Sequence, residues 1–140
     1  MSRFPLLLSV ACAMAMALPA PAPAQEKVPH VIVAIYHIAP GKQLEFLKWM
    51  AAREAIDREA GVGATQWYAH MNGDSWDYVA ISPDIDDATS DKLDEMARKK
   101  GLKIGAPAGL EFRQMVASHT DTMAAGPLTA SQMVDRATKP

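Results

Sequence analysis

Three histidines on or near strand-like segments are the residues of this sequence best suited to chemistry: His37, His70 and His119. An imidazole titrates near neutral pH, so it can act as a general acid or base when a carboxylate orients it. Asp77 is the candidate carboxylate for His70. The two lie opposite each other if the hairpin loop between them has four residues, and diagonally if it has two. We predict His70, His37 and Asp77 as catalytic candidates; the alternative is half-exposed strand-end histidines bonded to backbone or water.

Aromatic side chains near these histidines suggest a binding surface. Trp67 and Trp76 are expected on one face of a hairpin, where they form either the wall of a pocket for a flat apolar ligand or a subunit contact. Both roles are compatible in a barrel whose interior is the subunit interface. We predict Tyr68, Trp67, Trp76 and His119 as ligand-binding candidates.

Methionines beside two of the histidines raise the possibility of a copper site. His70 with Met71, and His119 with Met123, combine imidazole and thioether, which are ligand types that suit copper. Their spacing matches no established metal motif, and most of the methionines outside the N-terminal segment fit core packing. We therefore predict no metal ligand and no cofactor, and copper binding ranks third among the functional hypotheses.

The N-terminal segment, residues 1–24, has the three parts of a cleavable secretion signal. Arg3 supplies positive charge, residues 4–18 are almost entirely apolar, and Ala22 and Ala24 occupy the positions where signal peptidase accepts small residues. An uncleaved anchor is the alternative, disfavoured because the apolar run is short and ends in prolines. We predict cleavage after Ala24, a periplasmic or secreted location, and no membrane association after cleavage.

The expected mature chain, residues 25–140, is the right size for one domain. It keeps 116 of the 140 residues (140 − 24), and loss of Arg3 changes the formal net charge from −2 to −3. Cleavage also removes Cys12, the single cysteine, so the mature chain forms no disulfide. Its lysines and arginines form no patch of the kind that binds nucleic acid.

Strands and helices alternate along this domain. The β-branched run His30–Ile38 predicts a first strand with apolar residues on both faces. Residues 42–60 predict a helix that ends at Gly61. The residues expected to form its apolar stripe recur at helical spacing: Leu44, Leu47, Ala51 and Ala55.

Further along, Asn72-Gly73 predicts a tight type I′ turn between two antiparallel strands. The remaining elements are predicted in this order: strands 65–71 and 75–82, a helix from a cap at Ser90-Asp91 to near Gly101, a loop at 105–109, a helical turn or two at 110–116, a strand at 118–124, and a loose tail from about 126 with a short helix capped by Thr129.

The resulting βαββαβ order predicts an α+β, ferredoxin-like fold, an antiparallel sheet with helices on one face. At Ala39-Pro40-Gly41-Lys42, followed by Glu45-Phe46-Leu47, the chain resembles the opening of dimeric α/β-barrel proteins, and the resemblance covers roughly residues 31–125. It implies a homodimer in which two ferredoxin-like subunits pack sheet against sheet. It implies no particular activity, because the superfamily includes cofactor-independent monooxygenases, haem-degrading enzymes, lactone isomerases and members without known chemistry.

Together these patterns predict an exported homodimer that binds a small, largely apolar molecule in the cleft between sheet and helices. Catalysis through His70 or His37 is an extension of this hypothesis. The alternative is a non-catalytic homodimeric protein whose sheet face mediates assembly.

Overall fold

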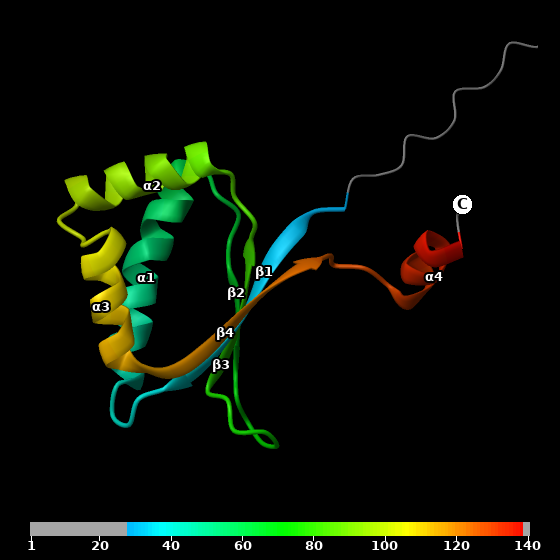
Figure 1. The fold of residues 1–140 in the computed structure, drawn as a ribbon, viewed down its shortest axis with the longest axis horizontal. Helices are drawn as coiled ribbons and strands as arrows, with labels where there is room; N and C mark the ends of the chain where they lie inside the picture. The colour runs from blue at the N-terminus through cyan, green and yellow to red at the C-terminus, as the bar shows by residue number, and fades with distance from the viewer. Residues whose placement is uncertain (1–27, 139–140) are drawn as a thin grey trace, which may run out of the picture.

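The computed structural model describes residues 28–138. The predicted signal segment, residues 1–24, and its cleavage site lie outside the described residues and stay predictions. The described elements follow the predicted order (Figure 1): β1 (His30–Ile38), α1 (Gln43–Ala60), β2 (Gln66–Ala69), β3 (Tyr78–Pro83), α2 (Asp87–Lys99), α3 (Gly105–Met115), β4 (Val116–Ala125) and α4 (Ala130–Thr138).

The four strands form one antiparallel sheet in the order β2-β3-β1-β4, with β1 and β3 at its centre. Figure 1 shows α1, α2 and α3 together on one side of this sheet. This is the ferredoxin-like arrangement, so the predicted α+β fold class is confirmed. Within the single chain the sheet is open rather than closed into a barrel.

The core lies where the sheet meets α1 and α3. Phe46 is 0% exposed, and the side chains buried with it include Tyr36 from β1, Ala80 from β3 and Met115 from α3. The ring centroids of Phe46 and Tyr36 are 5.1 Å apart. Burial of these apolar side chains is the main favourable contribution to folding.

The predicted apolar stripe of α1 is wrong. Leu44 is 64% exposed and Leu47 is 37% exposed, whereas Phe46 and Ile56 are buried. Ala51 and Ala55 are exposed as well. Apolar residues lie around most of the circumference of this helix, so their spacing does not select one face. The face carrying the larger Phe46 ring packs on the aromatic side chains of the sheet instead.

The predicted tight turn at Asn72-Gly73 is also wrong, because β2 ends at Ala69 and β3 begins at Tyr78. Asp77, just before β3, bonds to β1 as well as to His70, which follows β2. The Asp77 N–H donates to the Tyr36 carbonyl at 2.9 Å, and the Ile38 N–H donates to Asp77 Oδ2 at 2.6 Å. These bonds hold this part of the connection against the central strand.

Two helices begin earlier than predicted. α2 is capped by Asp86, whose Oδ1 accepts the Thr89 N–H at 2.8 Å, rather than by Ser90 or Asp91. The predicted loop at 105–109 is the first part of α3. Pro107 is compatible with a first helical turn because its missing N–H is not needed there.

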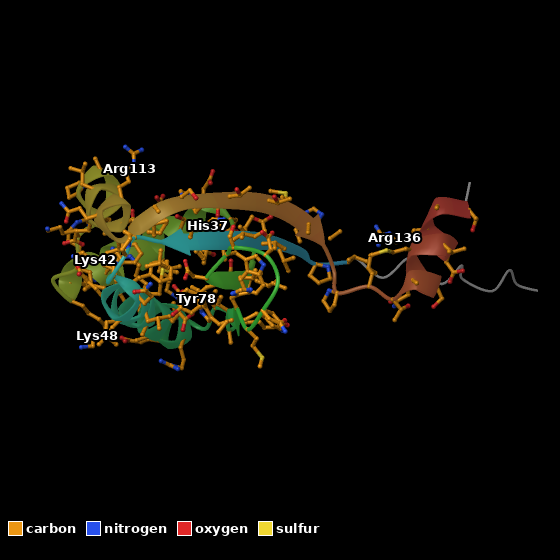
Figure 2. All side chains as sticks on the ribbon, turned by 90° about the horizontal axis from the view of Figure 1, so that it is seen from below. His37, Lys42, Lys48, Tyr78, Arg113 and Arg136 are labelled. Carbon is orange, nitrogen blue, oxygen red and sulfur yellow. The ribbon has the colours of Figure 1, made fainter. Side chains whose placement is uncertain are left out.

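The final strand and helix are confirmed. β4 is three residues longer than predicted, ten against seven. The predicted cap at Thr129 is present: its Oγ1 accepts the Gln132 N–H at 3.2 Å at the start of α4. Figures 1 and 2 show α4, marked by Arg136 in Figure 2, apart from the sheet and the other helices. None of the helices described is both long and apolar enough to span a membrane.

Candidate functional site

A cavity of about 400 Å³ lies between the sheet and helices α1 to α3. Its apolar part combines short side chains of the two central strands, Ala34 and Ala80, with larger ones from the helix layer such as Met50. Small residues at these positions leave space between the sheet and the helix layer, because neither side chain reaches across it. The volume is in the range of ligand pockets. Its polar part comes from Tyr36, charged residues of α1 and Asp121 of β4.

Tyr36 is the aromatic residue at the centre of this region. Its ring packs on Phe46, Trp67 and Phe112, with centroids 5.1, 5.8 and 6.2 Å away. Burial, and secondarily the negative charge of Asp121, raise the pKa of Tyr36 to about 12. The hydroxyl therefore stays protonated at neutral pH. Among the described residues it has no hydrogen-bond partner, so it is available to a ligand.

Two carboxyl groups on α1 line the cavity one helical turn apart, at Glu54 and Asp57. The Trp67 Nε1–H donates a hydrogen bond to Glu54 Oε1, which fixes that carboxylate against the sheet. Burial, and secondarily the negative charge of Glu54, raise the pKa of Asp57 above its ordinary value. This pair forms the acidic wall of the cavity.

The cavity wall formed by Arg53 is fixed by a network between α1 and α3. The guanidinium carbon lies 3.3 Å from the centroid of the Trp49 ring, and Nη2 donates to the Lys103 carbonyl at 2.9 Å. Burial lowers the pKa of Arg53, while the charges of Glu111 and Asp94 act in the opposite direction. Arg53 is therefore engaged by neighbouring protein groups.

Glu111 contacts two other members of this network, Trp49 and Lys103. It accepts Trp49 Nε1–H at 3.2 Å and forms an ion pair with Lys103 Nζ at 2.7 Å. These hydrogen bonds, first from Lys103 and then from Trp49, lower the pKa of Glu111. Glu111 lines a separate groove between α1 and α3 rather than the cavity.

Of the predicted histidines, His119 contacts residues that line the cavity. It lies two residues before Asp121 on the same face of β4, and its Nε2 is 3.5 Å from Asp121 Oδ2. Its ring stacks on Tyr36 at an interplanar angle of 16° and meets the Phe112 ring edge-on at 4.9 Å. Among the described residues, the histidine–carboxylate pair beside the cavity is thus His119 with Asp121.

The predicted catalytic residues His37, His70 and Asp77 gather elsewhere, at the end of the sheet where β2 connects to β3. His70 lies opposite Asp77, since the His70 N–H donates to the Asp77 carbonyl at 2.9 Å. The Asp77 carboxylate accepts the Ile38 N–H, and His37 Nδ1 lies 3.1 Å from the Ser75 carbonyl oxygen. The buried Nε2 of His70 has no hydrogen-bond partner among the described residues. None of the three lines the cavity.

Trp67 and Trp76, predicted to form one aromatic wall, lie in two different parts of the structure. Trp67 packs in the core against Tyr36 and donates to the cavity residue Glu54. Trp76 lies in the connection before β3 and meets the His70 ring edge-on at 5.1 Å. Tyr68 is 50% exposed on the face of the sheet opposite Trp67.

The two histidines of the copper hypothesis lie near opposite edges of the sheet. His70 follows β2, one edge strand, and His119 lies on β4, the other. Within residues 28–138, no group of three or more His, Cys, Asp or Glu side chains is placed to hold a metal ion.

Sequence reasoning missed the residues that form the polar part of the cavity: Tyr36, Glu54, Asp57 and Asp121. A signal existed for α1, because Glu54 and Asp57 are spaced to share one helix face with the buried Phe46 and the half-buried Met50. Tyr36 alternates with Ile35 and His37, so the strand pattern alone did not tell which of them faces the helices.

Comparison with known proteins supports the fold. No protein-family model and no curated protein sequence matches the chain. A structure of SnoaB, a cofactor-independent oxygenase from Streptomyces nogalater, is 13% identical over 74% of this chain and 97% of SnoaB, with a TM-score of 0.50. The Arabidopsis thaliana protein At3g17210 is 7% identical over 73% of this chain and 98% of its own, also with a TM-score of 0.50.

A dimeric ferredoxin-like protein from an uncultured marine organism is 9% identical, covers 73% of this chain and 90% of its own, and has a TM-score of 0.49. The chain shares the ferredoxin-like fold with the structures it matches. At such identities the likeness concerns the fold alone.

Proposed function

We propose that this protein binds a small organic molecule in the cavity between its sheet and helices α1 to α3. The observation that carries the proposal is the cavity of about 400 Å³, in which short apolar side chains of the central strands lie beside the Tyr36 hydroxyl and the α1 carboxyl groups. A cavity with an apolar surface and a few convergent polar groups is typical of small-molecule sites.

The predicted histidine chemistry is not needed for this function. His37, His70 and Asp77 do not line the cavity. The oxygenase activity of SnoaB is likewise not assigned to this chain, because the likeness concerns the fold alone. The proposed function is therefore binding, with export as a further proposal that rests on the sequence of residues 1–24.

Naphthylmethanol, a neutral two-ring alcohol, is a suitable first probe of the cavity. Proton–nitrogen correlation spectra resolve the indole N–H groups of the three tryptophans. The Trp67 indole N–H bonds to the cavity residue Glu54, whereas Trp76 lies against His70 at the end of the sheet. We expect saturable movement of the Trp67 signal and none of the Trp76 signal.

A matched pair of substitutions on α3 tests the location. Ala108 lines the cavity, and the exposed Ala106 of the same helix does not. Ala108→Phe fills part of the space and is expected to weaken binding at least tenfold, while Ala106→Phe leaves it unchanged. Saturable movement of the Trp67 signal that Ala108→Phe fails to reduce contradicts the proposal, and so does the absence of any movement with the alcohol and with its amine and carboxylate analogues.

We also propose that the protein is a homodimer formed through the face of the sheet opposite the helices. Val33, Ile35, Val79 and Ile81 are neighbours on this face by strand register, and Ile35 is 36% exposed. Threonines of β4 border them, since Thr120 pairs with Ile35. An apolar centre with a polar border is typical of subunit interfaces.

Analytical ultracentrifugation tests the dimer with two lysine substitutions on the same sheet. Ile35→Lys puts a charge on the open face and is expected to give monomers. Met123→Lys is the control, because Met123 pairs with Ile32 on the opposite face and is exposed. A monomeric unsubstituted protein at micromolar concentration, or an Ile35→Lys variant that stays dimeric, contradicts this interface.

A further inference from the structure

Charged side chains are distributed unevenly around the helix–sheet cavity. Each of its two cationic residues, Arg53 and Lys103, is engaged by a protein group outside it. Lys103 Nζ forms its ion pair with Glu111, and the Arg53 guanidinium stacks on Trp49 and donates to a backbone carbonyl. Neither Glu111 nor Trp49 lines the cavity. Both cations of this wall are therefore already paired with protein groups.

Four carboxyl groups line the cavity: Glu54, Asp57, Asp94 and Asp121. The charge of Asp94 acts on Arg53 and Asp121 lies beside His119, whereas Glu54 and Asp57 have no comparable partner among the described residues. Across residues 28–138, neither Glu54 nor Asp57 forms an ion pair with a lysine or arginine. Glu54 accepts one hydrogen bond, from the neutral indole of Trp67. The negative charge of Glu54 repels that of Asp57.

We infer that the molecule bound in this cavity is an organic cation, a protonated amine attached to an apolar body. This inference rests on the proposed binding function. The ammonium group would lie against Glu54 and Asp57, where it supplies the positive charge that those carboxylates lack. The apolar body would lie against the short side chains of the central strands, such as Ala34 and Ala80.

The other groups that face the cavity are compatible with a cation. Tyr36 is a neutral phenol, whose oxygen can accept a hydrogen bond from an ammonium group. Asp121 lies next to His119 at 3.5 Å and adds negative charge from the opposite side of the sheet–helix space. An anionic ligand would instead place its charge among four carboxyl groups, with both cations engaged elsewhere.

Three naphthalene derivatives of nearly equal size separate charge from shape: naphthylmethylamine, naphthylmethanol and naphthoate. Their dissociation constants are measured on the full folded protein by titration of the Trp67 indole signal at neutral pH. A charge-assisted hydrogen bond is about twice as strong as a neutral one. We therefore expect the amine to bind about tenfold tighter than the alcohol, and the carboxylate to bind more weakly than either.

Substitution of the carboxyl groups tests the assignment directly. Asp57→Asn keeps the size of the side chain and is expected to weaken amine binding at least threefold, and alcohol binding by a smaller factor. Asp121→Asn should act in the same direction. Asp91→Asn is the matched control, because this exposed residue of α2 lies outside the cavity lining.

The outcomes distinguish this inference from the proposed function. Equal affinities for amine and alcohol, or tightest binding of naphthoate, overturn the inference while the binding function stands. Binding of none of the three compounds overturns both. An amine preference that survives Asp57→Asn and Asp121→Asn together refutes the assignment of the cation to these carboxylates.

Discussion

Replacement of Phe46 by Ala tests which face of α1 belongs to the core. Phe46 is 0% exposed and packs against Tyr36, Trp67, Tyr78 and Phe112, with ring centroids 5.1 to 6.3 Å away. The sequence pattern instead favours the stripe that begins with Leu44 and Leu47. The two alternatives predict opposite orders of destabilisation.

The magnitude follows from the area that each side chain buries. A buried aromatic side chain removes about 150–250 Å² from water, which corresponds to about 4–6 kcal/mol at roughly 25 cal/mol per Å². Alanine retains part of this, so we expect Phe46→Ala to lower the free energy of unfolding by about 3–5 kcal/mol. Leu44 is 64% exposed, so Leu44→Ala should cost less than about 0.5 kcal/mol.

Urea denaturation followed by tryptophan fluorescence measures both values. Equal slopes of the unfolding free energy against urea concentration would show that only stability changed. If Phe46→Ala does not unfold the protein, its midpoint should fall well below that of Leu44→Ala; if it does, Phe46→Leu provides a milder change in the same order. A larger loss for Leu44→Ala than for Phe46→Ala or Phe46→Leu would refute the observed orientation of α1.

Three further predictions concern the cavity and the C-terminal helix. The pKa of Asp57 is raised in the folded state, so the folded protein binds more protons than the unfolded one and loses stability as pH rises from about 4 through that pKa. Asp57→Asn should remove this loss and be more stable than the unsubstituted protein at pH 7 by up to about 1 kcal/mol. A less stable variant would contradict this prediction. Tyr36→Phe should change stability by less than about 1 kcal/mol, because the hydroxyl has no partner among the described residues; a loss above about 2 kcal/mol in urea would show that it has one. Removal of residues 129–140 should change the free energy of unfolding by less than about 0.5 kcal/mol, because α4 has no buried residue. A large loss of stability would show that α4 packs on the domain.

The order of the elements could be predicted from sequence because each depends on local chemistry. The β-branched run at His30–Ile38 favours a strand wherever it is placed. Gly61 ends α1 with φ of 83°, a left-handed conformation that glycine adopts without a steric penalty. Thr129 caps α4 through its own side chain. The ferredoxin-like sheet order then follows from the βαββαβ sequence of elements.

Tertiary contacts decided the rest. The rotation of α1 about its axis depends on the packing of Phe46 among the rings of β1, β2 and β3, which no single segment encodes. The end of the β2–β3 hairpin depends on Asp77, which accepts a hydrogen bond from Ile38 and donates one to Tyr36. Both partners lie some forty positions away in the chain. A local pattern carries no information on such distant partners.

The sequence by itself determined the fold class and the strand-and-helix order. Only the tertiary structure decided that Tyr36, Glu54, Asp57 and Asp121, from two strands and one helix, surround a single cavity. The physical reason is that secondary structure follows from nearest-neighbour preferences. A cavity instead follows from the small side chains that face each other across the sheet–helix space, as at Ala34 and Ala80, and from which face of each element turns inward.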